Sequence, residues 1–547
     1  MKKFLTAITF AAVAVCMTAC STFQTAEADS PNTLKIGWAK RSIAKEGPVP
    51  ITGQFYLRIS QGQYTPVLAS ALAISTQKDS VIFVSLDIVS FSADTLKKVH
   101  AILKKEAPGI PVEKIILNAS HTHAGPSSNV IPSDYPRQLK VTPTEEMQAW
   151  LARQVAEAVK EAWAKRAPGS IAYGYGFATT GHSRRVVYMV DKGKQEKNYV
   201  PGLAMNGHAK MYGNTNDKDF DRYEAGTDAF INLMYTFDAK GKLTGAVINV
   251  PCPAQTSEHV WMLYASFWHY VRADLQKKYG DIGVIGQSAA AGDLSPRQLH
   301  YNAAEKRRYA LKYKDQIEAY MKNPMVNPNF KNWTPEQVRR QVEFDILELM
   351  RAVDIASRIT TAFDEVLSWA GKDKKSAVEL KHDVKTVNLS RRMFPKALID
   401  QEKKNHAAVM KMKYKEGGDP LEQLMYNSRL RSRRGRIAGL LARYEIQDKE
   451  PGITTDIHVV KFGNIAFATN RFELYLDYQH RIQARSPFEQ TFIVQLVTDV
   501  NGIGSYLATE QGVRNKGYSA TPYCNQVSPK GGQELVNETL NMLNKVK

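Results

Sequence analysis

The sequence has few cysteines and, after its first thirty residues, no long apolar segment. Of its four cysteines, Cys16 and Cys20 lie in the N-terminal leader, so Cys252 and Cys524 are the two that remain in the body of the chain. The sequence does not decide whether these two form a disulfide. No run of eighteen or more apolar residues follows the leader, which excludes a multi-span membrane protein and predicts a soluble body.

Several motifs that would indicate a particular chemistry are also missing. The chain has no phosphate-binding loop and no dinucleotide fingerprint, so we expect no organic cofactor. The Gly-x-Ser-x-Gly nucleophile elbow is absent, and a serine-hydrolase triad is therefore not indicated. No internal repeat or low-complexity linker divides the 547 residues, of which 43% are apolar and 23% charged, as in an ordinary globular protein.

The first thirty residues have the pattern of a bacterial export signal. Two lysines precede an apolar stretch, Phe4 to Val15, that is too short to span a bilayer. Small residues then lead to Cys20, as in lipoprotein signals, whereas a plain secretory signal would be cleaved after Ala28. We expect a periplasmic or outer-membrane lipoprotein in the bacterial cell envelope, held by a lipid on Cys20. Its parts are a signal peptide over 1–19, a tether over 20–33 and one domain over 34–547.

Positive charge dominates the sequence. Lys and Arg number 73 against 54 Asp and Glu, and removal of the leader lowers the formal charge from +19 to +17. The densest basic segment, 401–443, holds eleven basic and four acidic residues. An exported protein rarely meets nucleic acid, and no aromatic residues interleave these arginines, so we expect no nucleic-acid partner. We interpret the segment as a solvated helix face, with contact to anionic lipid or glycan as the alternative.

Strand-like and helix-like segments alternate along the body of the chain. A β-branched run at 81–89 predicts a buried strand, and helical spacing follows at 93–105. Thr144 is a plausible N-cap for a helix over 144–165. Together the segments favour an α/β fold. Further strands are expected at 114–118, 170–178, 228–237, 244–250, 455–469 and 491–498, and further helices at 260–279, within 303–365, within 397–444 and at 532–546.

Two histidines stand at the end of a predicted strand, in Asn118-Ala-Ser-His-Thr-His-Ala-Gly-Pro126. Side chains two residues apart in an extended segment face the same way, so His121 and His123 can both present imidazole nitrogens to one ion. Gly125 and Pro126 then turn the chain away. A bare His-x-His is a weak signal, and its place at a strand end strengthens it.

A second small-residue segment follows the strand predicted at 283–286. It reads Gln287-Ser-Ala-Ala-Ala-Gly-Asp-Leu-Ser-Pro296. Small residues let backbone and ligand approach closely, and Ser295 would sit in a tight turn where its hydroxyl and nearby amides address a carbonyl. Alone, the stretch is more simply an Asp-x-Ser-Pro turn.

The two segments together resemble the neutral ceramidase family. Its zinc-binding His-Thr-His-x-Gly-Pro is similar to 121–126, and its Gly-Asp-Val-Ser-Pro loop is similar to 292–296. The resemblance continues in order over roughly 34–545: Pro50–Gln54 is similar to the opening loop, Arg184 matches the substrate-site arginine, Glu473 the glutamate ligand, Tyr506 the tyrosine that approaches the metal, and Tyr518 a second tyrosine of the site. In the stretch around Tyr506 the closing glutamate, Glu510, comes one place early.

One departure concerns the metal. Where the family takes another zinc histidine, this sequence has Ala254, and Gln255 or His259 would have to substitute. Gln is a poor zinc ligand and His259 is several residues away, so fewer protein ligands weaken zinc affinity and could change the metal. Single matches also have simpler explanations: Glu473 as a helix N-terminal charge, the tyrosines as packing residues and Arg184 as a solvated side chain.

The resemblance implies a mixed-sheet, ceramidase-like catalytic domain with long helical insertions, and no C-terminal immunoglobulin-like domain is expected. It implies a zinc-dependent amidohydrolase that splits an N-acyl amide, ceramide or a related lipid, with a zinc-activated water. One zinc per chain would be held by His121, His123, Glu473 and Tyr506. Arg184, Tyr518 and Ser295 would act on the substrate, Ser295 by orientation rather than as nucleophile, because no base partner is evident.

Two alternatives stay open. The same fold could act on a carbohydrate or other polar substrate, or the protein could be a surface-binding lipoprotein without catalysis. A long apolar groove would favour the lipid, and a polar pocket lined by Arg, Asn and aromatic residues would favour the polar substrate. The sequence does not decide the oligomeric state.

Overall fold

The computed structural model describes residues 30–128, 139–195, 200–203, 205–502 and 504–547. The predicted signal peptide, Cys20 and most of the tether lie outside these residues. Within them, no helix combines the length and apolar character that crossing a bilayer requires.

Eight strands form one mixed sheet. The pairs β5–β6 and β13–β14 are parallel, and the other neighbours are antiparallel. Side chains alternate between the two faces of β4: Ala71 and Ala73 pack under helices, while Leu72 and Ile74 pack toward a second sheet. In order across the sheet, the strands are β14 (Gly283–Ser288), β13 (Leu243–Val250), β12 (Phe230–Asp238), β7 (Ala167–Phe177), β1 (Lys35–Ser42), β4 (Leu68–Ser75), β5 (Ser80–Leu86) and β6 (Ile115–Ala119).

The second sheet has four strands, β16 (Leu380–Ser390), β17 (Gly452–Phe462), β18 (Ile465–Thr469) and β20 (Gln490–Val494). Its inner face packs against the eight-stranded sheet in one fully buried apolar cluster. The rings of Phe83 and Phe467, one from each sheet, have centroids 4.9 Å apart.

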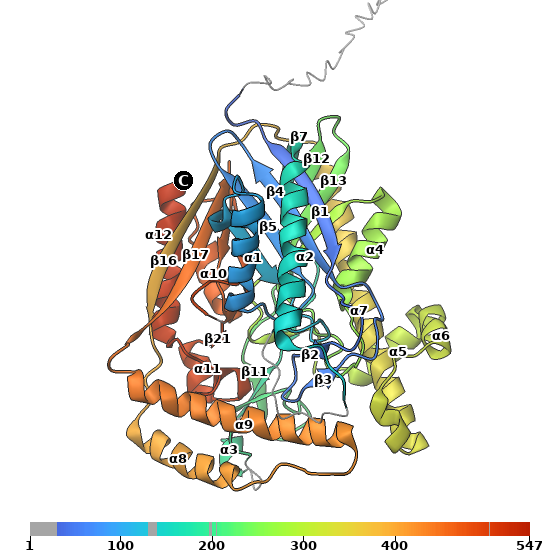
Figure 1. The fold of residues 1–547 in the computed structure, drawn as a ribbon, viewed down its shortest axis with the longest axis vertical. Coiled ribbons are helices and arrows are strands. Elements are labelled where there is room, and N and C mark those ends of the chain that lie inside the picture. The colour runs from blue at the N-terminus through green and yellow to red at the C-terminus, as the bar shows by residue number, and fades with distance from the viewer. Residues whose placement is uncertain (1–29, 129–138, 196–199, 204, 503) are drawn as a thin grey trace, which may run out of the picture.

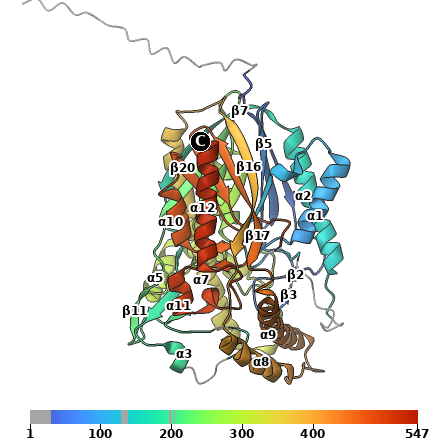
Figure 2. The same ribbon diagram turned by 90° about the vertical axis from the view of Figure 1, so that its left-hand side faces the viewer.

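Helices cover both outer faces (Figures 1 and 2). α1 (Ala93–Glu106) and α2 (Thr144–Ala164) cover one part of the large sheet, and α4 (Phe267–Tyr279) and α7 (Pro335–Ala370) another. α10 (Leu476–Gln483) and α12 (Pro529–Val546) cover the small sheet. The layers are therefore helix, sheet, sheet, helix, and the predicted α/β class with a mixed sheet is confirmed.

The remaining elements are short or peripheral. They are β2 (Pro50–Ile51), β3 (Arg58–Ile59), β8 (His182–Ser183), β9 (Arg185–Tyr188), β10 (Ala209–Met211), β11 (Phe220–Tyr223), β15 (Leu294–Ser295), β19 (Glu473–Leu474), β21 (Tyr506–Leu507), α3 (Lys192–Gln195), α5 (Asn302–Lys312), α6 (Lys314–Lys322), α8 (Lys396–Met410), α9 (Pro420–Ile446) and α11 (Glu510–Asn515).

Two details differ from the sequence predictions, and a third answers a question that the sequence left open. α2 begins at Thr144 after Pro143, so Thr144 is the first helical residue and not the N-cap. The helix expected over 260–279 begins only at Phe267, because the residues before it form a buried loop. Cys252 and Cys524 are both buried free thiols.

The prediction of a solvated face holds for Arg429, Arg431 and the lysines within 403–415, which are exposed, but not for the other arginines of α9. Arg433, Arg434 and Arg443 donate to backbone carbonyls of neighbouring segments. Arg436 lies among the rings of Phe55, Tyr518 and Tyr523 at 5.1 to 5.5 Å. Helices α8 and α9 lie beneath one end of the strands (Figure 1), and these contacts join them to that end.

Two buried histidines on neighbouring strands predict acid sensitivity. His382 Nδ1 donates to the Ser80 carbonyl at 3.2 Å, and its Nε2 accepts from His458 Nδ1 at 3.0 Å. Burial lowers the pKa of His458 to about 4, and that of His382 lies well below its ordinary value for the same reason.

Because the unfolded chain takes up protons near pH 6.5 and folded His458 only near pH 4, acid favours unfolding between these values. From His458 alone, we expect the free energy of unfolding to fall by about 2 kcal/mol between pH 7 and pH 5. Urea unfolding at the two pH values measures this change in the free energy of unfolding. His458→Asn cannot titrate and should lose that part of the pH dependence; an unchanged dependence would contradict the assignment.

Candidate functional site

The predicted site residues lie where the two sheets meet at their ends. His121 follows β6 of the large sheet, and Glu473 follows β18 of the small one. Gln495 joins the segments: its side-chain oxygen accepts from the Ala291 and Leu474 amides, at 3.1 and 2.9 Å. A Cβ on Gly292 would lie 2.3 Å from the Glu473 carbonyl, which explains the glycine in the 292–296 turn.

Two imidazoles and one carboxylate converge there. His121 Nε2 lies 3.4 Å from His123 Nε2 and 3.4 Å from Glu473 Oε2. His121 Nδ1 donates to the Val89 carbonyl at 2.8 Å, so Nε2 is the ring nitrogen that faces His123 and Glu473. His121 has φ +65°, a conformation that a histidine adopts at a cost. The strained turn holds its ring toward Glu473.

Burial and nearby charges shift the pKa of two of these groups, His123 and Glu473. Burial lowers the pKa of His123 to about 3. Burial alone would raise the pKa of Glu473, but the charge and hydrogen bond of His121 and the charge of Arg184 lower it. Glu473 is therefore ionised at neutral pH.

Arg184 and the two predicted tyrosines surround Glu473. Parallel pairing of β19 with β21 sets Glu473 opposite Tyr506. The Arg184 guanidinium, 3% exposed, donates to the Gly292 carbonyl at 2.8 Å and to Tyr506 Oη at 3.1 Å, and lies 3.9 Å from Glu473 Oε2. The Tyr506 and Tyr518 rings have centroids 5.7 Å apart. The neighbouring Arg185 turns away and pairs with Glu224.

Ser295 lies in the turn beside this group. β15 pairs with β8, which carries Ser183, and the Arg184 amide donates to the Asp293 carbonyl at 3.1 Å. The Ser295 hydroxyl contacts the Tyr212 hydroxyl and accepts from the Arg297 amide at 3.1 Å. No histidine bonds to Ser295 among the described residues, and its orienting role stays a prediction.

Sequence reasoning missed Glu258 and Tyr212. Glu258 Oε2 lies 3.9 Å from His123 Nδ1, and Glu258 Oε1 accepts from Tyr212 Oη at 3.2 Å. Tyr212 has φ +52°. Neither residue lies in a motif of its own, although Glu258 follows closely on Ala254. A glutamate next to the altered segment was the available signal.

The two substitutes considered for the missing histidine lie differently. Gln255 Nε2 donates to Glu258 Oε1 at 2.8 Å and to Tyr212 Oη at 3.1 Å, so its amide belongs to the Glu258 network. His259 is an exposed residue whose ring lies 6.1 Å from that of Phe344. It does not join the His121 group.

The side chains of His121, His123 and Glu473 can be compared with the ligands of a zinc site in donor type and separation. Among the described residues, no group of three or more His, Cys, Asp or Glu side chains forms a ready-made metal site. The separations of 3.4 Å from His121 Nε2 to His123 Nε2 and to Glu473 Oε2 nevertheless match those of ligand atoms about 2.0–2.2 Å from one tetrahedral ion. Imidazole Nε2 and carboxylate are donors that zinc accepts, and the Val89 contact is the support that metal-binding histidines usually have. The residues fit the ion in donor type and spacing.

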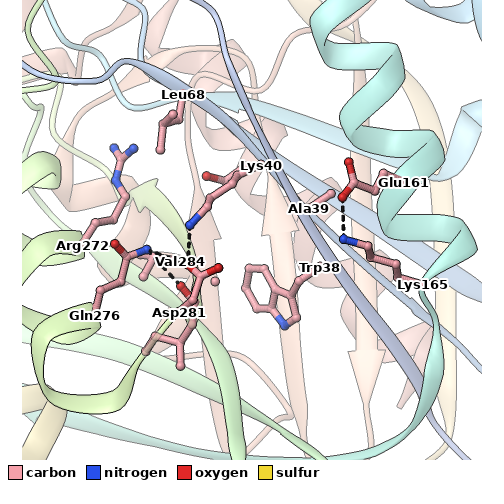
Figure 3. A pocket seen from close by; sticks show the side chains of 13 residues that line it. Trp38, Ala39, Lys40, Leu68, Glu161, Lys165, Arg272, Gln276, Asp281 and Val284 are labelled. Carbon is pink, nitrogen blue, oxygen red and sulfur yellow. Dashed lines mark hydrogen bonds and ion pairs between the residues drawn. The ribbon is translucent and has the colours of Figure 1, made fainter.

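Two cavities differ in their relation to this group. The pocket in Figure 3, of about 350 Å³, contains none of the predicted site residues. Its charged side chains pair with one another: Lys40 lies 2.5 Å from Asp281, and Glu161 the same distance from Lys165. We assign it no function.

The second cavity, of about 410 Å³, lies against Tyr212. Aromatic and apolar side chains form one part of its wall, and amide and charged side chains the rest. Arg297 Cζ lies 5.3 Å from the Tyr212 ring centre and 5.5 Å from that of Phe344. The lining includes Tyr212, Asn214, Asn216, Arg297, Asn302, Lys306, Phe344 and Glu348.

Comparison with known proteins identifies the fold. No family model and no curated protein sequence matches the chain. The crystal structure of neutral ceramidase from Pseudomonas aeruginosa is similar over 94% of this chain and 75% of that chain, with a TM-score of 0.60 and 15% identity. A ceramidase complexed with C2 is similar over the same shares, with a TM-score of 0.58 and 14% identity. The predicted resemblance is confirmed for the fold, which is that of the neutral ceramidases; the site roles stay predictions.

Proposed function

We propose that the protein is a zinc-dependent amidohydrolase that cleaves an N-acyl amide of a ceramide-like lipid. The observation that carries this proposal is that His121 Nε2 lies 3.4 Å from both His123 Nε2 and Glu473 Oε2. Arg184 and Tyr506 stand beside them. The ceramidase-like fold supports the same reaction class.

Each side chain has a distinct part in the proposal. His121, His123, Glu473 and Tyr506 would hold one zinc ion. The bound ion would supply a Lewis acid and a water of lowered pKa. Arg184 and Tyr518 donate hydrogen bonds to the carbonyl oxygen of the substrate as negative charge develops on it, and such a donor contributes about 3–4 kcal/mol. Ser295, held in its turn, orients the carbonyl.

We also propose that the protein works in the bacterial cell envelope, anchored by a lipid on Cys20. The basis is the leader sequence, which places Cys20 after small residues. A tether of about a dozen residues would let the domain reach amides of the nearby membrane or of host molecules, so a lipid substrate suits this location.

The test uses protein beginning at Ser21, loaded with zinc and offered a panel of N-acyl amides. We expect release of fatty acid from ceramide, measured by mass spectrometry, and loss of this release after metal removal by a chelator, with recovery on adding zinc. Unchanged release in the chelator would overturn the zinc dependence. Release from none of the amides would overturn the proposed reaction.

The cavity against Tyr212 favours a second candidate, a polar N-acyl substrate such as an acylated amino sugar. Its lining combines amides, Arg297 and an aromatic ring, which suits hydroxyl groups better than an alkyl chain. Tyr212 separates the cavity from Glu258 and Ser295. In the same panel, faster cleavage of N-acyl amino sugars than of ceramide would select this candidate.

A further inference from the structure

Glu258 lies against the far side of the second imidazole. His123 directs Nε2 toward His121, at 3.4 Å, and Nδ1 toward Glu258, whose Oε2 is 3.9 Å away. Both side chains are largely buried: the exposed fraction is 12% for His123 and 17% for Glu258. His123 Nδ1 is a buried polar atom with no hydrogen-bond partner among the described residues. A buried nitrogen of this kind costs free energy until it finds an acceptor.

Three donors fix the Glu258 carboxylate at this place. Gln54 Nε2 donates to Oε2 at 3.1 Å, while Gln255 Nε2 and Tyr212 Oη donate to Oε1 at 2.8 and 3.2 Å. The donors come from three separate segments of the chain, so the carboxylate is held from several sides. A shift of less than 1 Å brings Oε2 within hydrogen-bond distance of His123 Nδ1.

The ring of His123 is fixed from another side as well. A Cβ on Gly53 would lie 2.6 Å from Cγ of His123, so the loop at 50–54 packs directly on the imidazole. Gly53 has φ +109°, a conformation open to glycine. The ring therefore has little room to turn, and its two nitrogens keep their separate neighbours.

We propose that Glu258 is a positioning residue that accepts the Nδ1–H of His123 and thereby presents an unprotonated Nε2 to the metal. It does for His123 what the Val89 carbonyl does for His121. Carboxylate support of this kind raises the basicity of a histidine ligand and fixes its orientation. The inference rests on the proposed zinc site. It assigns the glutamate four residues after Ala254 to the support of the second imidazole.

The test measures zinc affinity directly, by competition with a chromophoric chelator, in the full mature chain without its lipid. We expect Glu258→Ala to weaken zinc binding about 10- to 100-fold. Glu258→Gln keeps a side-chain oxygen that can accept from Nδ1, so it should retain part of the lost affinity. Glu489→Ala is the matched control, because Glu489 accepts from a tyrosine hydroxyl, at 2.9 Å, outside the site. The zinc affinity of Glu489→Ala should equal that of the unmodified protein.

Cobalt substitution gives a second readout that a purely structural role would not move. The visible absorption of bound Co²⁺ depends on its ligand geometry, so it should change in Glu258→Ala and stay constant in Glu489→Ala. Equal zinc affinity and equal cobalt spectra in Glu258→Ala would overturn the inference while the zinc site stands. Absence of zinc binding in the unmodified protein would instead overturn the proposed function.

Discussion

Replacement of both His121 and His123 by alanine is expected to abolish zinc binding and to lower amide hydrolysis by about 10³-fold or more. Loss of the two imidazoles leaves Glu473 as the remaining strong donor of the converging group. A metal Lewis acid contributes several kcal/mol to such a reaction, and each 1.4 kcal/mol is a factor of ten. Elemental mass spectrometry of the purified variant measures the metal, and fatty-acid release measures the reaction.

The control for this double variant is His406→Ala, on α8, which lies outside the converging group. It should keep about one zinc per chain and full activity. Stoichiometric zinc in the double variant would show that the ion binds elsewhere and would remove the basis of the assignment. Zinc absent from the unmodified protein as well, even after zinc is supplied, would favour a non-catalytic surface lipoprotein.

Arg184→Ala is expected to lower kcat/KM by about 10²-fold or more, because it removes a buried donor beside the reacting group. It also leaves the Gly292 carbonyl without its donor and Glu473 with less positive charge nearby. The unsatisfied groups should cost about 1–3 kcal/mol in the free energy of unfolding. Steady-state kinetics and urea unfolding measure the two effects.

Arg185→Ala is the matched control, since the two arginines are adjacent in sequence and both are buried. Arg185 is bound to Glu224 and to the Lys516 carbonyl, away from Glu473. Its removal breaks a buried ion pair and should cost about 3–5 kcal/mol in stability. The folded fraction should retain zinc and kcat/KM close to normal. If instead Arg184→Ala kept its kcat/KM, the donor role of Arg184 would be wrong.

The sequence predicts the helices and strands that depend on neighbouring residues, and it misses those that depend on contacts between residues far apart in the chain. Apolar runs and helical spacing were sufficient for β5, β6, α1 and α7, because burial and periodicity are local properties. The strands β1, β4 and β16 were not predicted, because their sequences form strands only through pairing with partners in the sheets.

The same distinction holds for the site. The pair at 121 and 123 could be found from its own spacing, whereas Glu473 required a resemblance, because it lies beside His121 only in the folded chain. Glu258 was missed because its role depends on a ring 135 positions earlier and on donors that include Gln54 and Tyr212 from distant segments. Arg184 and Arg185 point to opposite sides, as successive residues of an extended segment do. The fold decides that Arg184 faces Glu473 while Arg185, which is also buried, faces Glu224.

The junction between the two sheets has a consequence for how the protein tolerates change. His121 follows β6 of the large sheet and Glu473 follows β18 of the small one, so the distance between them depends on how the apolar layer holding Phe83 and Phe467 is filled. Protein interiors are close-packed, so a change in volume there shifts one sheet relative to the other. Packing in the layer between the sheets therefore affects the geometry of the site. Substitutions in this buried layer would change the distances within the site although they lie far from any reacting atom. We therefore expect natural relatives to differ there by pairs of substitutions that compensate each other in volume.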